Sequence, residues 1–147
     1  MSNFDPISLA LLLALLALMP TLIVVSTSFL KIAVVMSLLR NAIGVQQTPP
    51  NLALYGMAII LTAYIMAPVG IHIFERLAEN TATIQSVGGL MDGLRDGAEP
   101  LREFLQKNSK AEQRDFFVRT AYRLWGEELA RNVTPQDFLV LVPAFVV

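Results

Sequence analysis

The feature that most constrains this chain is an uncharged run of 25 residues, Pro6–Leu30, close to its first residue. A helix of roughly 20 apolar residues crosses the hydrocarbon core of a bilayer, so this run is long enough to do so. Asp5 before Pro6 predicts the helix start, because aspartate caps free amides and proline fits the first helical position. Pro20 removes a helical hydrogen bond, so we expect a bend or break near Met19. We expect the hydroxyls that follow to bond the freed carbonyls: Thr21, Ser26, Thr27 and Ser28.

A second uncharged stretch begins at Asn41 and ends at Phe74, and its continuous apolar part starts at Leu52. Two such stretches with a polar link predict an all-α protein built on bent hydrophobic helical hairpins. The predicted boundaries are residues 1–74 for the hairpin, with membrane-type segments at about 6–36 and 52–74 linked by 37–51. The early charge is acidic rather than cationic, which argues against a cleaved secretory signal.

Charge divides the chain into two parts. Glu75–Asp137 holds twenty charged residues, and the rest of the chain holds only Asp5, Lys31 and Arg40. The mixed signs predict a solvated helical domain over 75–137. A net charge of −1 offers no basic field for nucleic acid, and the lack of cysteine excludes disulfides and thiolate metal sites. The apolar residues 138–147 are too few to cross a bilayer and are predicted to start a further, truncated hydrophobic segment.

Local patterns predict the structure inside the charged region. Ser86–Gly97 holds four glycines and is predicted to be a loop or irregular linker. Ser109–Glu112 matches a capping box and predicts a helix that ends near Ala130. One face of that helix is expected to belong to the core: Phe117, Ala121, Leu124, Trp125 and Glu128. Thr134–Asp137 is a second helix-start pattern.

The cations predict a topology. Lys31 and Arg40 flank the link between the two hydrophobic segments. The positive-inside rule therefore places the link on the cytoplasmic side, and Glu75–Asp137 on the outer side, in the periplasm of a Gram-negative cell.

The sequence holds little that points to catalysis. Its single histidine, His72, is not enough for a histidine-based zinc site, and no nucleophile elbow, P-loop or dinucleotide fingerprint is present. We therefore expect no enzyme activity, no cofactor and no metal. We interpret His72 as a packed or interfacial residue.

Lys31 is unusual because apolar residues flank it on both sides. A lysine in such a position is costly unless it snorkels to an interface or finds a partner. The residues alone favour a helix-end anchor over an inter-subunit contact.

The segment Arg40–Asn51, RNAIGVQQTPPN, interrupts the apolar sequence with polar groups. Gly44 is expected to end one helix, the two prolines force extended backbone, and Asn51 is expected to cap the next helix. A plain turn does not need a guanidinium and two further amides, so we predict contacts to another protein. The candidate interface residues are Lys31, Arg40, Asn41, Gln46, Gln47, Pro49, Pro50 and Asn51.

The same region carries a family resemblance. Ser28–Gly70, SFLKIAVVMSLLRNAIGVQQTPPNLALYGMAIILTAYIMAPVG, resembles the signature region of the FliP/SctR family of bacterial type III secretion export-apparatus proteins. The long RNA-x-G-x-QQ-x-PPN pattern carries most of this resemblance, and the terminal LVPAFVV adds to it. STSFLKIAVV and ALYGMAIILTAYIMAPVG are more similar to the injectisome branch, SctR, than to the flagellar branch.

The resemblance implies a non-enzymatic, structural subunit of the export gate in the bacterial inner membrane. It implies a pentamer with SctS-like and SctT-like subunits, beside SctU-like and SctV-like proteins, and unfolded secreted proteins passing through the channel. It also implies that the apolar helices pack as bent hairpins on neighbouring subunits, largely above the bilayer plane, which weakens the anchor interpretation of Lys31. Family members continue for two more hydrophobic segments, so the chain is expected to be truncated at its carboxy-terminal end. The alternative is a membrane-anchored binding or sensor module with a two-helix anchor.

Overall fold

The computed structural model describes residues 5–45, 48–79 and 86–147. Every regular element in these ranges is a helix, so the predicted all-α class is confirmed for this part of the chain. The elements in chain order are α1 (Pro6–Ser26), α2 (Phe29–Ile43), α3 (Asn51–Glu79), α4 (Val87–Gly97), α5 (Glu99–Asn108), α6 (Ala111–Ala130) and α7 (Phe138–Val146).

Helix α1 begins where the sequence predicts. The Asp5 carboxylate accepts a hydrogen bond from the Ile7 amide at 3.2 Å, and Pro6 occupies the first helical position. Of the bend or break expected near Met19, the break is not found, because the helix continues through Pro20. A helix of 21 residues keeps its hydrogen bonds on both sides of the proline, so the loss of one bond does not end it.

The chain breaks instead at Thr27, whose extended backbone (φ −98°, ψ 173°) ends α1. The Ser26 hydroxyl donates to the Leu22 carbonyl, and the Thr27 hydroxyl donates to the Ile23 carbonyl at 2.6 Å. These are end-of-helix carbonyls, and neither is the one that Pro20 frees. The segment predicted at 6–36 is therefore two helices.

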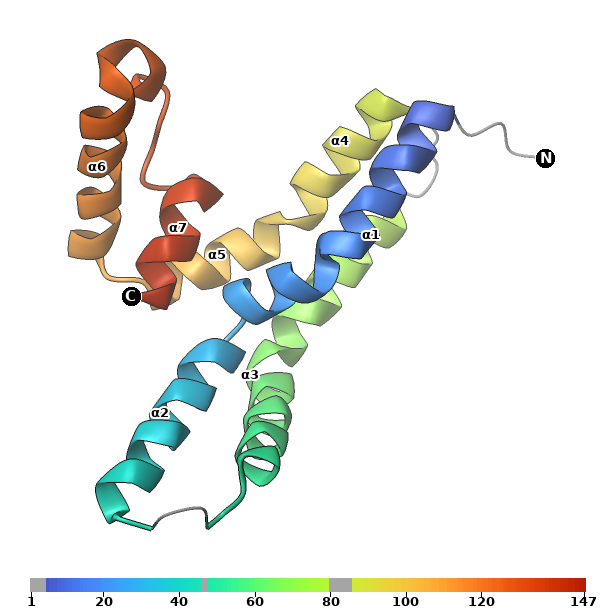
Figure 1. The fold of residues 1–147 in the computed structure, drawn as a ribbon. Coiled ribbons are helices and arrows are strands. Elements are labelled where there is room, and N and C mark those ends of the chain that lie inside the picture. The colour runs from blue at the N-terminus through green and yellow to red at the C-terminus, as the bar shows by residue number, and fades with distance from the viewer. Residues whose placement is uncertain (1–4, 46–47, 80–85) are drawn as a thin grey trace.

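Helices α2 and α3 form an antiparallel hairpin whose turn lies at the lower end of the molecule (Figure 1). Helix α2 continues to Ile43 and α3 starts at Asn51, so the connection is shorter than the predicted link over 37–51. Helix α3 also continues beyond residue 74 to Glu79. It therefore carries the first charged residues of the 75–137 region as an extension of the hydrophobic hairpin.

The prediction of a loop over Ser86–Gly97 is wrong, because these residues form α4, with the Ser86 hydroxyl accepting from the Gly89 amide at 3.1 Å. The reason is a contact between α4 and α3. A Cβ atom on Gly97 would lie only 2.7 Å from the Leu77 Cδ2 atom of α3. The glycine thus allows two helices to approach closely and does not mark a turn.

The capping-box prediction is also wrong. Ser109 is the C-cap of α5, and Lys110 is the N-cap of α6 without a side-chain capping bond. The Arg114 guanidinium donates to the Ser109 hydroxyl and to the Ser109 carbonyl, both at 2.9 Å. These bonds hold Ser109 at the carboxy-terminal end of α5. Helix α6 reaches Ala130 as predicted, with a kink at Gly126, whose φ is +78°.

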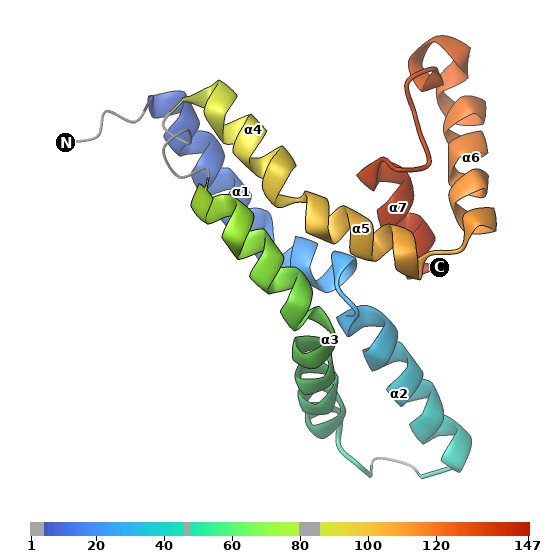
Figure 2. The same ribbon diagram turned by 180° about the vertical axis from the view of Figure 1, so that it is seen from behind.

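The predicted core face of α6 is largely exposed. Leu124 is 73% exposed and Trp125 is 43% exposed, whereas Ala121 is buried. Helix α6 packs mainly on α7, and the two helices form a pair at the far end of α5 (Figure 2). A partner of nine residues covers only part of a 20-residue helix, which explains the exposure.

The buried core lies where α5 meets α7. Leu105, Leu141 and Phe145 form its centre, and Phe104 packs against Phe145 with a ring-centroid distance of 5.6 Å. Helix α7 starts after the predicted helix-start pattern and not within it, because Asp137 is its N-cap. The Asp137 carboxylate accepts from the Thr134 amide at 3.1 Å and from the Thr134 hydroxyl at 3.0 Å, so these residues form a turn before the helix.

Helices α1 and α3 are long and apolar enough to cross a membrane by length and composition. Only 6% of the residues in the apolar window of each helix are buried. The molecule therefore presents most of its apolar helix surface outward.

Candidate functional site

The turn between α2 and α3, residues 44–50 with the flanking Arg40 and Asn51, is called the elbow below. Gly44 ends α2 in a left-handed conformation with φ +75°, which glycine adopts without the strain of a side chain. Its amide donates to the Asn41 carbonyl at 3.1 Å. The Pro50 carbonyl then accepts from the Ala53 amide at 2.9 Å and opens α3.

Arg40 closes the elbow from within the chain. Its Nη1 donates to the Asn51 Oδ1 atom and to the Pro49 carbonyl, the latter at 3.5 Å. The Asn51 side chain thus serves as acceptor for Arg40, whereas the sequence predicts a helix cap. The guanidinium also lies in the last turn of α2, where a cation interacts favourably with the helix dipole. The link between these three residues makes the elbow a braced turn.

The other described residues of the predicted interface do not take part in this brace through their side chains. Asn41 and Pro50 are exposed and contribute the backbone bonds described above. Gln46 and Gln47 lie outside the described residues. The prediction that the candidate set contacts another subunit stays a prediction.

The structure adds apolar residues to this site that the sequence analysis missed. Large apolar side chains around the elbow are exposed between 41% and 83%, and we call them the elbow patch: Leu38, Leu39, Ile43, Val45, Leu52 and Tyr55. A braced polar turn within an exposed apolar surface has the composition of a protein interface. The signal in the sequence was the presence of apolar residues on more than one side of the helix that precedes Gly44.

Lys31, in the first turn of α2, packs against another helix of the same chain. Its Nζ lies 4.1 Å from the centroid of the Phe145 ring of α7, within the range of a cation–π interaction. Burial lowers the pKa of Lys31, and the nearby charge of Lys110 lowers this pKa further. The helix-end anchor favoured by the residues alone is therefore replaced by an interhelical contact.

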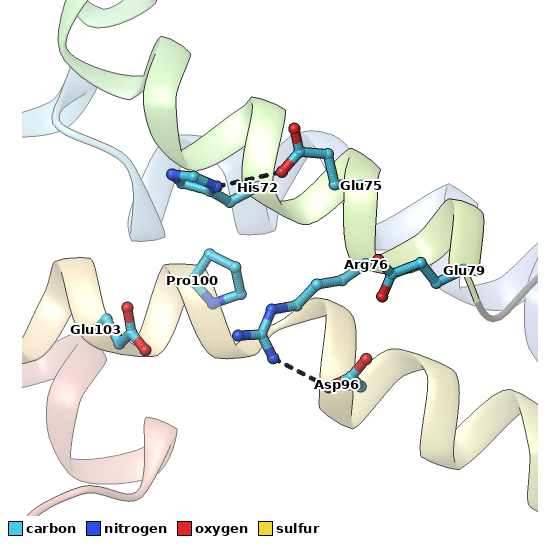
Figure 3. A pocket seen from close by; sticks show the side chains of 7 residues that line it. All are labelled: His72, Glu75, Arg76, Glu79, Asp96, Pro100 and Glu103. Carbon is cyan, nitrogen blue, oxygen red and sulfur yellow. Dashed lines mark hydrogen bonds and ion pairs between the residues drawn. The ribbon is translucent and has the colours of Figure 1, made fainter.

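His72 lies on the polar side of α3, in an open pocket of about 490 Å³ between α3, α4 and α5 (Figure 3). Its Nδ1 is 3.4 Å from a carboxylate oxygen of Glu75, and its side chain is 65% exposed. His72 is therefore not packed within the chain, and its role as an interfacial residue stays a prediction. Arg76 joins α3 to α4 through an ion pair of 3.1 Å with Asp96. Exposed pairs of this kind contribute little to stability.

The described residues contain no cluster of three or more potential metal ligands. The pocket shown in Figure 3 mixes acidic side chains with Arg76 and His72, which is the pattern of a solvated seam between helices. An apolar groove of about 440 Å³ lies on another side of α3, between α1, α4 and α5. Its lining includes Met19, Ile23, Met66, Ile73, Leu94 and Leu101.

Two helices that are apolar and long enough to cross a membrane, α1 and α3, and a braced proline turn between α2 and α3 define an all-α protein with an outward-facing apolar surface. The FliP family model matches residues 12–147, and the chain belongs to the FliP family. The resemblance seen in the Ser28–Gly70 region is thereby confirmed.

Named relatives agree with the injectisome branch of this family. The chain is 43% identical over 143 residues to Yop proteins translocation protein R of Yersinia pestis, covering 97% of this chain and 66% of that protein. It is 41% identical over 146 residues to virulence protein YscR of Salmonella typhimurium, covering 97% and 66%. It is 42% identical over 150 residues to hypersensitivity response secretion protein HrcR of Ralstonia nicotianae, covering 99% and 68%. The chain thus spans about two thirds of the length of these relatives.

Proposed function

We propose that this chain is a structural part of the export gate of a bacterial type III protein secretion system. The observation that carries the proposal is the outward-facing apolar surface of α1 and α3 in a member of the FliP family. Exposure of such a surface to water is unfavourable by about 25 cal/mol per Å², so the surface needs lipid or protein around it. Relatives named for translocation and secretion support protein export as the setting.

Several features support neighbouring subunits as the main cover of this surface. The hydrophobic sequence is broken at Thr27, a lysine packs at the start of α2, and the polar elbow interrupts the apolar helices. Polar groups and broken helices of this kind are tolerated at membrane depth where protein surrounds them. In this proposal the helices pack against copies of the chain, as a pentamer, and against SctS-like and SctT-like subunits, with SctU-like and SctV-like proteins adjacent.

The proposed location is the bacterial inner membrane. Lys31 and Arg40 lie at either end of α2 and support a cytoplasmic side for the elbow. Residues 75–137 then form a charged helical domain on the periplasmic side. Unfolded secreted proteins pass through the channel that the assembled subunits enclose, and the chain acts without catalysis.

The test replaces both glutamines of the elbow, Gln46→Ala with Gln47→Ala, in the full-length protein within its host. Because the Arg40 brace stays intact, we expect normal membrane insertion but at least about a tenfold loss of secretion, as the loss of two interface hydrogen bonds implies. Secretion is measured by effector protein in the culture medium, and assembly by co-purification of the other subunits.

The matched control is Gln106→Ala, which removes an exposed glutamine of α5 away from the elbow. It should leave secretion unchanged. Normal assembly and secretion in the double variant would show that the elbow does not serve the proposed assembly.

A further inference from the structure

The first turn of α2 holds a buried hydroxyl that has no hydrogen-bond partner. Ser28 is the N-cap residue of α2 and is only 7% exposed, yet its side chain makes no capping bond. Its Oγ is unpaired among the described residues. Its backbone is helical (φ −67°, ψ −7°), whereas a capping serine is normally extended so that its oxygen reaches the amides of the first turn. A buried hydroxyl without a hydrogen-bond partner is unfavourable, so an acceptor from outside the described residues would stabilise it.

A cation shares the same turn. Lys31 follows Ser28 by three residues, a spacing that places both side chains on one side of a helix. Its ammonium rests on the Phe145 ring, and it forms no ion pair with any carboxylate in the part of the chain that the structure describes. Burial lowers its pKa, as expected for a cation without a compensating anion.

The two charged side chains that the structure brings to this turn, Lys31 and Lys110, are both cations. The amino-terminal end of a helix carries partial positive charge and free amides. Lys110 adds a second cation close enough to lower the pKa of Lys31. The sequence has no acidic residue between Asp5 and Glu75, so α2 and most of α3 offer none. The turn therefore presents hydrogen-bond donors and positive charge without an anion.

We propose that the first turn of α2 binds a carboxylate, supplied by an aspartate or glutamate of a neighbouring protein subunit. One carboxylate oxygen accepts from the Ser28 hydroxyl and the other pairs with the Lys31 ammonium. Lys31 is only partly exposed. The proposal therefore includes a movement of its flexible side chain off the Phe145 ring when the carboxylate binds. The inference rests on the proposed function, because it needs an assembly that brings another subunit to α2.

A protein carboxylate suits this turn better than a lipid phosphate. Two donors on one side of the helix match the two oxygens of a carboxylate. Ser28 is buried and Phe145 covers the ammonium, so the acceptor must be small and must be delivered by a surface that packs against α2 and α7. A phosphate headgroup carries a third oxygen and a bulky ester, and it stays at the aqueous edge of a bilayer.

The experiment uses a carbodiimide on the intact complex, purified with the full-length protein. The reagent activates a carboxylate, and the Lys31 amine then forms an amide bond with it, while the carbodiimide takes up the elements of water as a urea. We expect mass spectrometry to find Lys31 joined to an aspartate or glutamate of another subunit. Mixing isotope-labelled and unlabelled copies separates a bond to a second copy of this chain from a bond within one chain.

Three substitutions complete the test. Lys31→Arg keeps the charge and should assemble normally, but its guanidinium gives no amide product. Lys31→Met should lose the product and reduce the assembled complex by about tenfold or more, as expected for a lost charged hydrogen bond. Ser28→Ala should reduce the yield of cross-link several-fold, and Ser28→Thr should retain it.

A complex that assembles but shows no cross-link from Lys31 to another subunit would overturn the inference and leave the proposed function intact. So would a product confined to carboxylates of the same chain, or a lipid adduct in its place. Normal assembly of Lys31→Met would have the same consequence. Failure of every variant and of the wild type to form a complex would instead contradict the proposed function itself.

Discussion

At the scale of single residues, Arg40 shows how a polar group in an apolar region can serve the fold and the assembly together. Its guanidinium links the end of α2 to Pro49 and Asn51 at the start of α3. The bonds are intramolecular, so they set the direction in which the elbow and the elbow patch point. Arg40 is thus held by the brace, and the exposed apolar side chains of the elbow patch lie around it.

We expect Arg40→Ala to lower the melting temperature of the detergent-solubilised protein by about 3 °C, because the loss of a partly exposed charged hydrogen bond costs about 1 kcal/mol. Arg123→Ala is the control, since Arg123 is an exposed arginine of α6. The pair Arg40→Ala and Asn51→Ala should be less than additive, because both remove the same bond. Equal melting temperatures for Arg40→Ala and Arg123→Ala would show that the brace adds no stability.

At the scale of elements, the contact between α3 and α4 depends on small residues. Gly93 and Gly97 are buried in α4, and Gly97 approaches Leu77 more closely than any residue with a Cβ atom could. The ion pair between Arg76 and Asp96 lies at the same seam and is roughly half-exposed. Steric fit therefore positions α4 more strongly than charge does.

Gly97→Ala should destabilise the protein by about 1–3 kcal/mol, because the new methyl group overlaps the Leu77 side chain. Gly88→Ala is the matched control within α4, since a Cβ atom there meets open space and alanine favours a helix. Its effect should be neutral or stabilising by up to about 1 kcal/mol. Thermal unfolding measures both, and addition of Leu77→Ala should relieve the Gly97→Ala overlap. A Gly97→Ala variant as stable as Gly88→Ala would contradict the close packing.

At the scale of the whole molecule, the small core and the exposed apolar helices both show that a single chain buries little of its apolar surface. The buried cluster gathers around Leu105, Leu141 and Phe145, while α1 and α3 bury little of their own surface. A chain of this kind gains most of its burial by association.

We expect the full-length protein, extracted from its host membrane in mild detergent, to run as a large particle together with other small membrane proteins. Size-exclusion chromatography with light scattering gives its mass, and electron micrographs should show rings. The anchored sensor alternative predicts a monomer or dimer of the chain in detergent. A monodisperse monomer from cells that secrete normally would contradict the export-gate proposal.

Sequence reasoning worked where the cause of a structure is local. The start of α1 at Asp5 and Pro6, the end of α2 at Gly44 and the start of α7 after Thr134–Asp137 each depend on residues within one turn. The elbow was recognisable for the same reason, because its glycine and prolines restrict only their own backbone and that of their neighbours.

It failed where the cause lies far along the chain. The glycines of α4 predict a loop, although the close approach of Leu77 in α3 accounts for at least Gly97. One side of α6 is exposed because the short helix α7 covers only part of it. Lys31 contacts Phe145, which lies more than 100 residues further along the chain.

The sequence alone therefore determined that this protein is helical, that two of its helices are apolar enough for a membrane, and that a proline-rich polar turn joins α2 to α3. The tertiary structure decided which glycine lets two helices approach closely, which apolar faces remain uncovered, and which side chain lies next to each charged group. Helix caps and turns arise from backbone bonds between near neighbours. Helix packing arises from side chains that only the folded chain brings together.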